Sequence, residues 1–174
     1  MRFLQGVVAL GVFVVVSAAV PAQAADRDLV ILNVGQSDIG DSDEETVEAS
    51  IEYSSRRAYW GNGSWFSGAG PLLGLMITGK GAVFGYAGVY GDFFLGNSFV
   101  VRPEIGVGAF APGDGKDLGG VFEIHASLTA AYVFGNQARL GVTLSHISNA
   151  GTHDSNPAVE SLLLTYAFPI GPLF

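Results

Sequence analysis

The stretch from Val121 to Phe134 reads VFEIHASLTAAYVF and alternates between apolar and polar side chains over most of its length. Its odd positions from 123 to 129 carry Glu, His, Ser and Thr. A period of two is typical of a β-strand with two unlike faces. The stretch therefore predicts a strand that separates an apolar from a polar environment. Its apolar face would be formed by Phe122, Ile124, Ala126, Leu128, Ala130, Tyr132 and Phe134.

The same alternation recurs along the chain and predicts further strands. Residues 47–54 set Val, Ala, Ile and Tyr against Glu and Ser, and weaker alternation covers 100–110, 138–148 and 160–168. One more strand is expected near 27–36, and two more in 70–91, a glycine-rich apolar stretch whose phase stays open. These add up to about eight strands, which predicts an all-β fold, an eight-stranded antiparallel β-barrel. Turn-forming residues separate the strands at 37–45, 55–69, 92–98, 111–119, 135–137 and 149–157.

Composition decides between a soluble and a transmembrane barrel. The 174 residues are 49% apolar and only 14% charged, with 25 Gly, no Cys and a mean hydropathy of +0.39. A disordered tail, a coiled coil, a disulfide scaffold and a zinc-thiolate site are excluded. The second face of the strands carries Gly, Ser and Thr rather than the heavy charge that a water-soluble barrel needs. A transmembrane barrel of the Gram-negative outer membrane is favoured, with interfacial aromatic residues at Trp60, Trp65, Tyr166 and Phe168.

The N-terminus predicts export. Val7 to Val20 is apolar but shorter than the roughly 20 residues that span a bilayer as a helix. Arg2 precedes this run, and Ala22-Gln23-Ala24 ends it with the pattern of a secretory cleavage site. We therefore expect a signal peptide at 1–24 and a barrel domain at 25–174, the alternative being an uncleaved anchor. Removing residues 1–24 leaves seven basic against 16 acidic residues, a net charge of −9 that disfavours nucleic acid as a partner.

The apolar phase of the last two strands is broken by polar residues. His146 and Ser148 occupy positions of one predicted strand whose side chains should face outward. Glu160 occupies the first outward-facing position of the next strand. The loop 149–157 joins these ends, so the three side chains should share one patch of the outer wall. With both termini of the chain in the periplasm, odd-numbered strands run outward, and this loop would lie at the cell surface.

These residue types are those of nucleophilic acyl transfer. A Ser oxygen becomes nucleophilic when a neighbouring His takes its proton and a carboxylate orients that His. Asn149 and the residues up to Gly151 follow the Ser directly and could supply oxyanion-hole donors. Two alternatives stay open: Asp154 could replace Glu160, or the polar residues could simply meet lipid headgroups at the interface.

The remaining histidines and acidic runs carry weaker signals. His125 should face the lumen in a polar network with Glu123, and His153 lies in an exposed loop. Three scattered His do not predict a metal site. The acidic run 41–45 (DSDEE) is most simply a solvated loop.

The run His146-Ile-Ser148-Asn149-Ala150-Gly151, followed by Asn156 and by Glu160-Ser161, resembles the lipid A 3-O-deacylases of the PagL family. In that family's pattern the Glu follows the Ser by twelve residues, as Glu160 follows Ser148 here. The resemblance implies an outer-membrane esterase that removes the ester-linked acyl chain at the 3-position of lipid A. Ser148 would be the nucleophile, His146 the base and Glu160 the third member of the triad.

The resemblance also bears on the oxyanion hole, on ligands and on alternatives. It implies an oxyanion hole at Asn149 and Gly151, no metal and no cofactor, and a substrate, lipid A or lipopolysaccharide, in the outer leaflet around an embedded barrel. A homodimer is compatible with it. A non-catalytic small barrel serving adhesion or membrane integrity remains the alternative of another class, and a phospholipase or acyltransferase barrel is a third.

Overall fold

The computed structural model describes residues 27–61, 65–171 and 173, so the predicted signal peptide at 1–24 lies outside the described residues. In this part of the chain, no helix is long and apolar enough to cross a membrane. The described residues form eight β-strands in chain order. They are β1 (Asp28–Ser37), β2 (Thr46–Ser54), β3 (Phe66–Thr78), β4 (Val83–Leu95), β5 (Phe99–Ala111), β6 (Phe122–Val133), β7 (Arg139–Ser148) and β8 (Val159–Ile170).

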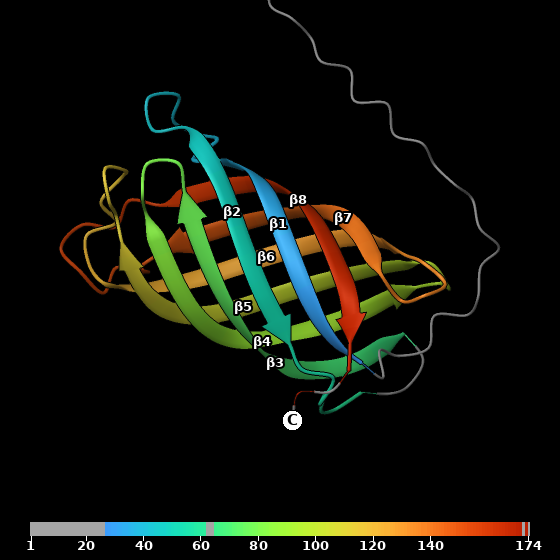
Figure 1. Cartoon of the computed structure of the whole chain (residues 1–174). Coiled ribbons are helices and arrows are strands. Elements are labelled where there is room, and N and C mark those ends of the chain that lie inside the picture. Colours follow the sequence, from blue (N-terminus) through green and yellow to red (C-terminus); the bar gives the residue numbers. More distant parts are fainter. Residues whose placement is uncertain (1–26, 62–64, 172, 174) are drawn as a thin grey trace, which may run out of the picture.

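The strands form a closed antiparallel barrel, which confirms the predicted fold class (Figure 1). Each strand pairs with the next, and β1 closes the barrel against β8 with Asp28 opposite Ile170. Closure leaves no strand edge unpaired. The loops 38–45, 79–82, 112–121 and 149–158 all lie at the end opposite this pair, and we call that end the loop rim.

The two faces of the barrel follow the alternation of the sequence. In β6 the side chains of Glu123, His125, Ser127 and Thr129 are buried inside the barrel, as the odd positions predicted. Outward positions carry exposed apolar side chains on every strand. Examples are Val34, Ile51, Leu73, Val89, Ile105, Leu128, Leu144 and Leu164.

The structure of β3 and β4 shows which residues of 70–91 face the interior, a point that the sequence left open. The interior at this point is apolar and aromatic, with Leu72, Phe84 and Tyr86 buried, so both faces read alike in the sequence. A Cβ at Gly74 would lie 2.1 Å from the Tyr86 ring, which shows that the ring occupies the space a side chain would need. The glycines here make room for large interior rings.

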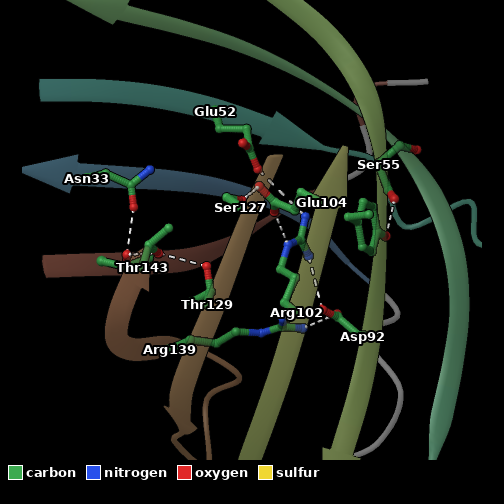
Figure 2. A network of polar contacts seen from close by, with 12 residues as sticks. Asn33, Glu52, Ser55, Asp92, Arg102, Glu104, Ser127, Thr129, Arg139 and Thr143 are labelled. Carbon is green, nitrogen blue, oxygen red and sulfur yellow. Dashed lines mark hydrogen bonds and ion pairs between the residues drawn. The ribbon is translucent and has the colours of Figure 1, made fainter. Parts of the chain in front are cut away.

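Two predicted turn segments are shorter in the structure. The last residues of the predicted turn 55–69 belong to β3 in the structure, and the first residues of the predicted turn 92–98 belong to β4. Asp92 is disfavoured in strands by its polar side chain, but inside the barrel it binds two guanidinium groups. Its carboxylate accepts hydrogen bonds from Arg102 at 3.2 Å and from Arg139 at 3.0 and 2.7 Å (Figure 2). These ion pairs inside the barrel explain why β4 continues beyond residue 91, where the sequence predicted the strand to end.

The lumen network predicted between His125 and Glu123 does not form. Among the described residues, the two carboxylate oxygens of Glu123 have no hydrogen-bond partner, and Nδ1 of His125 has none either. The His125 ring packs instead on Tyr86, with ring centroids 4.5 Å apart. Elsewhere in the lumen, Glu104 accepts hydrogen bonds from Arg102 and from Ser127 (Figure 2).

Candidate active site

The candidate site lies on the outer wall where β7 and β8 approach the loop rim. The register of these strands sets His146 directly opposite Glu160. Ser148 is two residues beyond His146 on β7, so both share one face of the strand. The predicted patch of His146, Ser148 and Glu160 is therefore assembled by the pairing of two neighbouring strands.

The three side chains are joined by two hydrogen bonds. Nε2 of His146 lies 2.9 Å from Oγ of Ser148, and Nδ1 lies 3.1 Å from Oε1 of Glu160. The imidazole and the carboxylate are about half exposed, at 46% and 48%, whereas Ser148 is 9% exposed. With the ring proton on Nδ1, His146 donates to Glu160 and accepts the hydroxyl proton of Ser148 at Nε2. A carboxylate, an imidazole and a hydroxyl linked in this order can generate a serine nucleophile.

Asn149 has a different environment from that expected for an oxyanion donor. It is fully buried, and its Nδ2 donates to the carbonyls of Leu118 at 2.7 Å and Ser155 at 2.8 Å. Its Oδ1 accepts the backbone N–H of Gly151 at 2.9 Å, an Asx turn. Both residues predicted at the oxyanion hole are thus occupied by contacts within the chain, and Asn149 ties Ser148 to the loops 112–121 and 149–158.

Asn156 has a defined contact beside the nucleophile. Its Oδ1 accepts the backbone N–H of Asn149 at 3.0 Å. The motif contained this residue, but spacing alone gave it no role. The contact holds the exposed side chain of Asn156 next to the residue that follows Ser148.

The segment that carries Glu160 is held by two loops. The backbone N–H of Ile39 donates to the carbonyl of Glu160 at 3.1 Å. Lys116 donates to Asp38 at 2.8 Å and to the carbonyl of Ala158 at 3.3 Å. Partial burial by itself would lower the pKa of Lys116, but the hydrogen bond and charge of Asp38, with Asp41 and Glu160, raise that pKa above its ordinary value. Sequence reasoning missed Lys116, because an isolated Lys in a loop carries no spacing signal.

The other polar residues of the rim are not part of this chain of hydrogen bonds. Asp154 is exposed and contacts neither His146 nor Ser148 through a hydrogen bond. His153 contacts Thr152 at 3.1 Å, and its ring lies against Gly120, where a Cβ would be 2.2 Å from Nε2. Within the described ranges, no group of three or more His, Asp or Glu side chains is arranged to hold a metal ion. The geometry therefore favours Glu160 over Asp154 as the partner of His146.

The family model described as Lipid A 3-O-deacylase (PagL) matches residues 45–169. The chain belongs to the PagL family. This membership confirms the resemblance read from the motif and identifies the chain as a lipid A deacylase of the outer membrane. Lipid A deacylase PagL of Pseudomonas aeruginosa is 29% identical over 165 residues, which cover 86% of this chain and 88% of that protein.

Solved structures resemble this PagL family member in fold. The crystal structure of the outer membrane enzyme PagL superposes with a TM-score of 0.65 at 24% identity, over 82% of this chain and 99% of that one. A de novo designed transmembrane β-barrel reaches a TM-score of 0.55 at 13% identity, over 86% of this chain and 99% of the design. At these identities the likeness supports the barrel architecture alone.

Proposed function

We propose that the chain is a serine esterase that hydrolyses the ester-linked acyl chain at the 3-position of lipid A. Ser148 is the nucleophile, His146 the general base and acid, and Glu160 the group that orients the imidazole. The observation that carries the proposal is the continuous hydrogen-bond path from Ser148 Oγ through His146 to Glu160, with distances of 2.9 and 3.1 Å. Family membership supplies the substrate class.

Acylation follows from this path. As Ser148 Oγ attacks the ester carbonyl, Nε2 of His146 takes the hydroxyl proton, and the negative charge of Glu160 stabilises the imidazolium that forms. When the tetrahedral intermediate collapses, the 3-hydroxyl oxygen of lipid A leaves with the proton from His146. The acyl chain remains as an ester of Ser148.

Deacylation uses the same groups with water as the attacking nucleophile. His146 takes a proton from water as its oxygen attacks the acyl ester, and returns that proton to Ser148 Oγ when the fatty acid leaves. The imidazole is half exposed and lies beside the loop rim, where water can reach it. The site can therefore take its ester from the membrane and its water from outside.

The outer wall around the site suits a lipid substrate. Below His146 and Glu160, the next outward pair of the same two strands is Leu144 opposite Leu162, and both are exposed. We propose that the barrel is embedded in the bilayer, that this apolar wall contacts acyl chains of the outer leaflet, and that the loop rim faces the cell surface. Exposed aromatic residues at the opposite end suit an interface with headgroups; they are Tyr59, Trp60, Trp65, Phe99 and Tyr166.

The test is deacylation of purified lipid A by the purified protein, measured by mass spectrometry as loss of one hydroxyacyl group. Ser148→Ala should reduce the rate by about 10³-fold or more. Ser145→Ala is the matched control, because Ser145 lies on the same strand but is buried on the lumen side. Equal rates for wild type and Ser148→Ala would reject the triad. Hydrolysis of phospholipid vesicles, or transfer of the acyl chain to another lipid, would change the substrate or reaction assignment.

A further inference from the structure

The outer wall of the barrel carries a polar side chain that the triad does not use. Among the described strand residues, Tyr166 aside, exposed polar side chains occur only at Gln36, His146 and Glu160. Every other exposed position of these strands is apolar. The three polar residues lie near the loop rim on β1, β7 and β8, which are neighbours in the closed barrel (Figure 1). Gln36 therefore interrupts the outward apolar pattern in the same way as the triad residues, on the next strand.

Strand pairing places Gln36 beside the triad. Gln36 lies opposite Leu162 of β8, and Glu160 is the next outward residue of β8 toward the loop rim. Diagonal neighbours of this kind are about 7–8 Å apart, within reach of a long side chain. The two strands stay together up to this point, because the backbone N–H of Ile39 donates to the carbonyl of Glu160 at 3.1 Å. The Gln36 side chain can therefore reach the edge of the site on the side of Glu160.

The amide of Gln36 is not used within the described part of the chain. It has two N–H donors and a carbonyl acceptor, and no hydrogen bond joins them to another described residue. The three triad side chains, in contrast, are bonded to one another. A polar group on a lipid-facing wall costs free energy when it lacks a hydrogen bond. A polar group of a bound lipid removes that cost.

We propose that Oε1 of Gln36 accepts a hydrogen bond from the amide N–H that lies next to the scissile ester of lipid A. The assignment rests on the proposed function, because it requires lipid A as the substrate. Lipid A is built on glucosamine, whose nitrogen at the 2-position carries an acyl chain in amide linkage beside the ester at the 3-position. The nearby Glu160 carboxylate attracts the N–H groups of the Gln36 amide, which leaves Oε1 for the substrate.

This contact selects the substrate and does not speed the chemical step. The amide at the 2-position is unchanged when the ester is cut, so its hydrogen bond is equally strong in the bound substrate and in the transition state. Such uniform binding lowers KM and leaves kcat nearly unchanged. A glycerophospholipid has no amide N–H beside its acyl esters and gains nothing from Gln36. Gln36 is thus a specificity-determining residue that favours acylated glucosamine over phospholipids of the same membrane.

The experiment compares two monosaccharide lipids that differ in one atom group. They are 2-N,3-O-diacylglucosamine 1-phosphate and 2,3-di-O-acylglucose 1-phosphate, in which an ester oxygen replaces the amide N–H. Hydrolysis at the 3-position is followed by mass spectrometry in mixed micelles with the purified full chain. For Gln36→Leu we expect KM on the amide lipid to rise by roughly 3- to 10-fold, with kcat within about 2-fold of wild type. On the diester, the two proteins should have equal KM values.

Two results would overturn the assignment. One is an equal KM of wild type and Gln36→Leu on the amide lipid, and the other is the same rise in KM on both lipids. Leu suits the apolar wall, so the urea midpoint of unfolding should not fall, and Gln36→Met, a side chain of similar length without an amide, repeats the test. Gln137→Leu is the matched control, because the same replacement is made in the turn at the opposite end of the barrel.

The proposed function and the role of Gln36 fail in different ways. If wild type leaves the 3-ester of both lipids intact, or if Ser148→Ala cuts the amide lipid as fast as wild type, the esterase assignment fails and the role of Gln36 falls with it. If Ser148→Ala is inactive while Gln36→Leu keeps the wild-type KM on the amide lipid, the esterase stands and only the role of Gln36 is rejected.

Discussion

Asp92 and Arg139 face each other across the barrel interior through two parallel hydrogen bonds, at 3.0 and 2.7 Å. Both side chains are almost completely buried, and Asp92 also accepts from Arg102 (Figure 2). The Arg102 guanidinium in turn stacks on Tyr90 at 3.7 Å from the ring centroid. Two cations and one carboxylate therefore join β4, β5 and β7 inside the barrel.

Removing the shared carboxylate should strongly destabilise the barrel. Asp92→Asn leaves Arg139 buried without an anionic partner, and breaking a buried pair in this way costs about 3–5 kcal/mol. The measurement is the free energy of unfolding in urea for protein in lipid vesicles, followed by tryptophan fluorescence. Asp114→Asn, at an exposed loop position, should stay within about 0.5 kcal/mol of wild type. A similar small effect for Asp92→Asn would mean that the ion pairs contribute little.

Alternation predicted the barrel well because most strands have one apolar and one polar face. It failed to set the phase of 70–91, where Leu72, Phe84 and Tyr86 make the interior as apolar as the outside. It also ended β4 too early, because Asp92 is a turn former by local propensity and its Arg partners, 10 and 47 residues further along the chain, lie on other strands. A single sequence carries no signal for such long-range pairing.

Glu160, rather than Asp154, should orient His146 in the reaction. Glu160→Gln removes the negative charge that stabilises the imidazolium, and kcat should fall by roughly 10²- to 10⁴-fold. Asp154→Asn should leave kcat unchanged, because the Glu160 carboxylate already accepts from Nδ1. Both variants are assayed on lipid A by mass spectrometry, with KM determined separately. A larger loss for Asp154→Asn than for Glu160→Gln would reverse the assignment.

The sequence predicted which side chains gather at the site but not how their donors are used. His146 and Ser148 were found because polar residues interrupted an outward apolar phase, and strand pairing brings Glu160 to them. Asn149 was expected at the oxyanion because of its position in the motif. Its contacts with Leu118 and Ser155 depend on how two loops meet, and neither alternation nor spacing encodes that.

The outward face should be sensitive to charge according to its depth in the bilayer. Leu164 is exposed near the middle of β8, and Arg in its place should cost about 2–4 kcal/mol of unfolding free energy in lipid vesicles. Val47 is also exposed but is the second residue of β2, at the loop rim, so Val47→Arg should cost only about 0–1 kcal/mol. Equal tolerance of the two substitutions would contradict a bilayer around the barrel.

The contact between Lys116 and Asp38 should make the loop rim sensitive to alkaline pH. The pKa of Lys116 is raised in the folded chain, since the opposing effect of burial is outweighed by Asp38, Asp41 and Glu160. Its contribution to stability is therefore fully present below the ordinary lysine pKa of about 10.4 and is lost as pH rises through the folded value. Lys116→Arg keeps its charge in this range and is the matched control. When the pH is raised from neutral to above about 11, the urea midpoint of unfolding should fall further for wild type than for Lys116→Arg. An equal fall for the two proteins would assign the alkaline loss of stability to other groups.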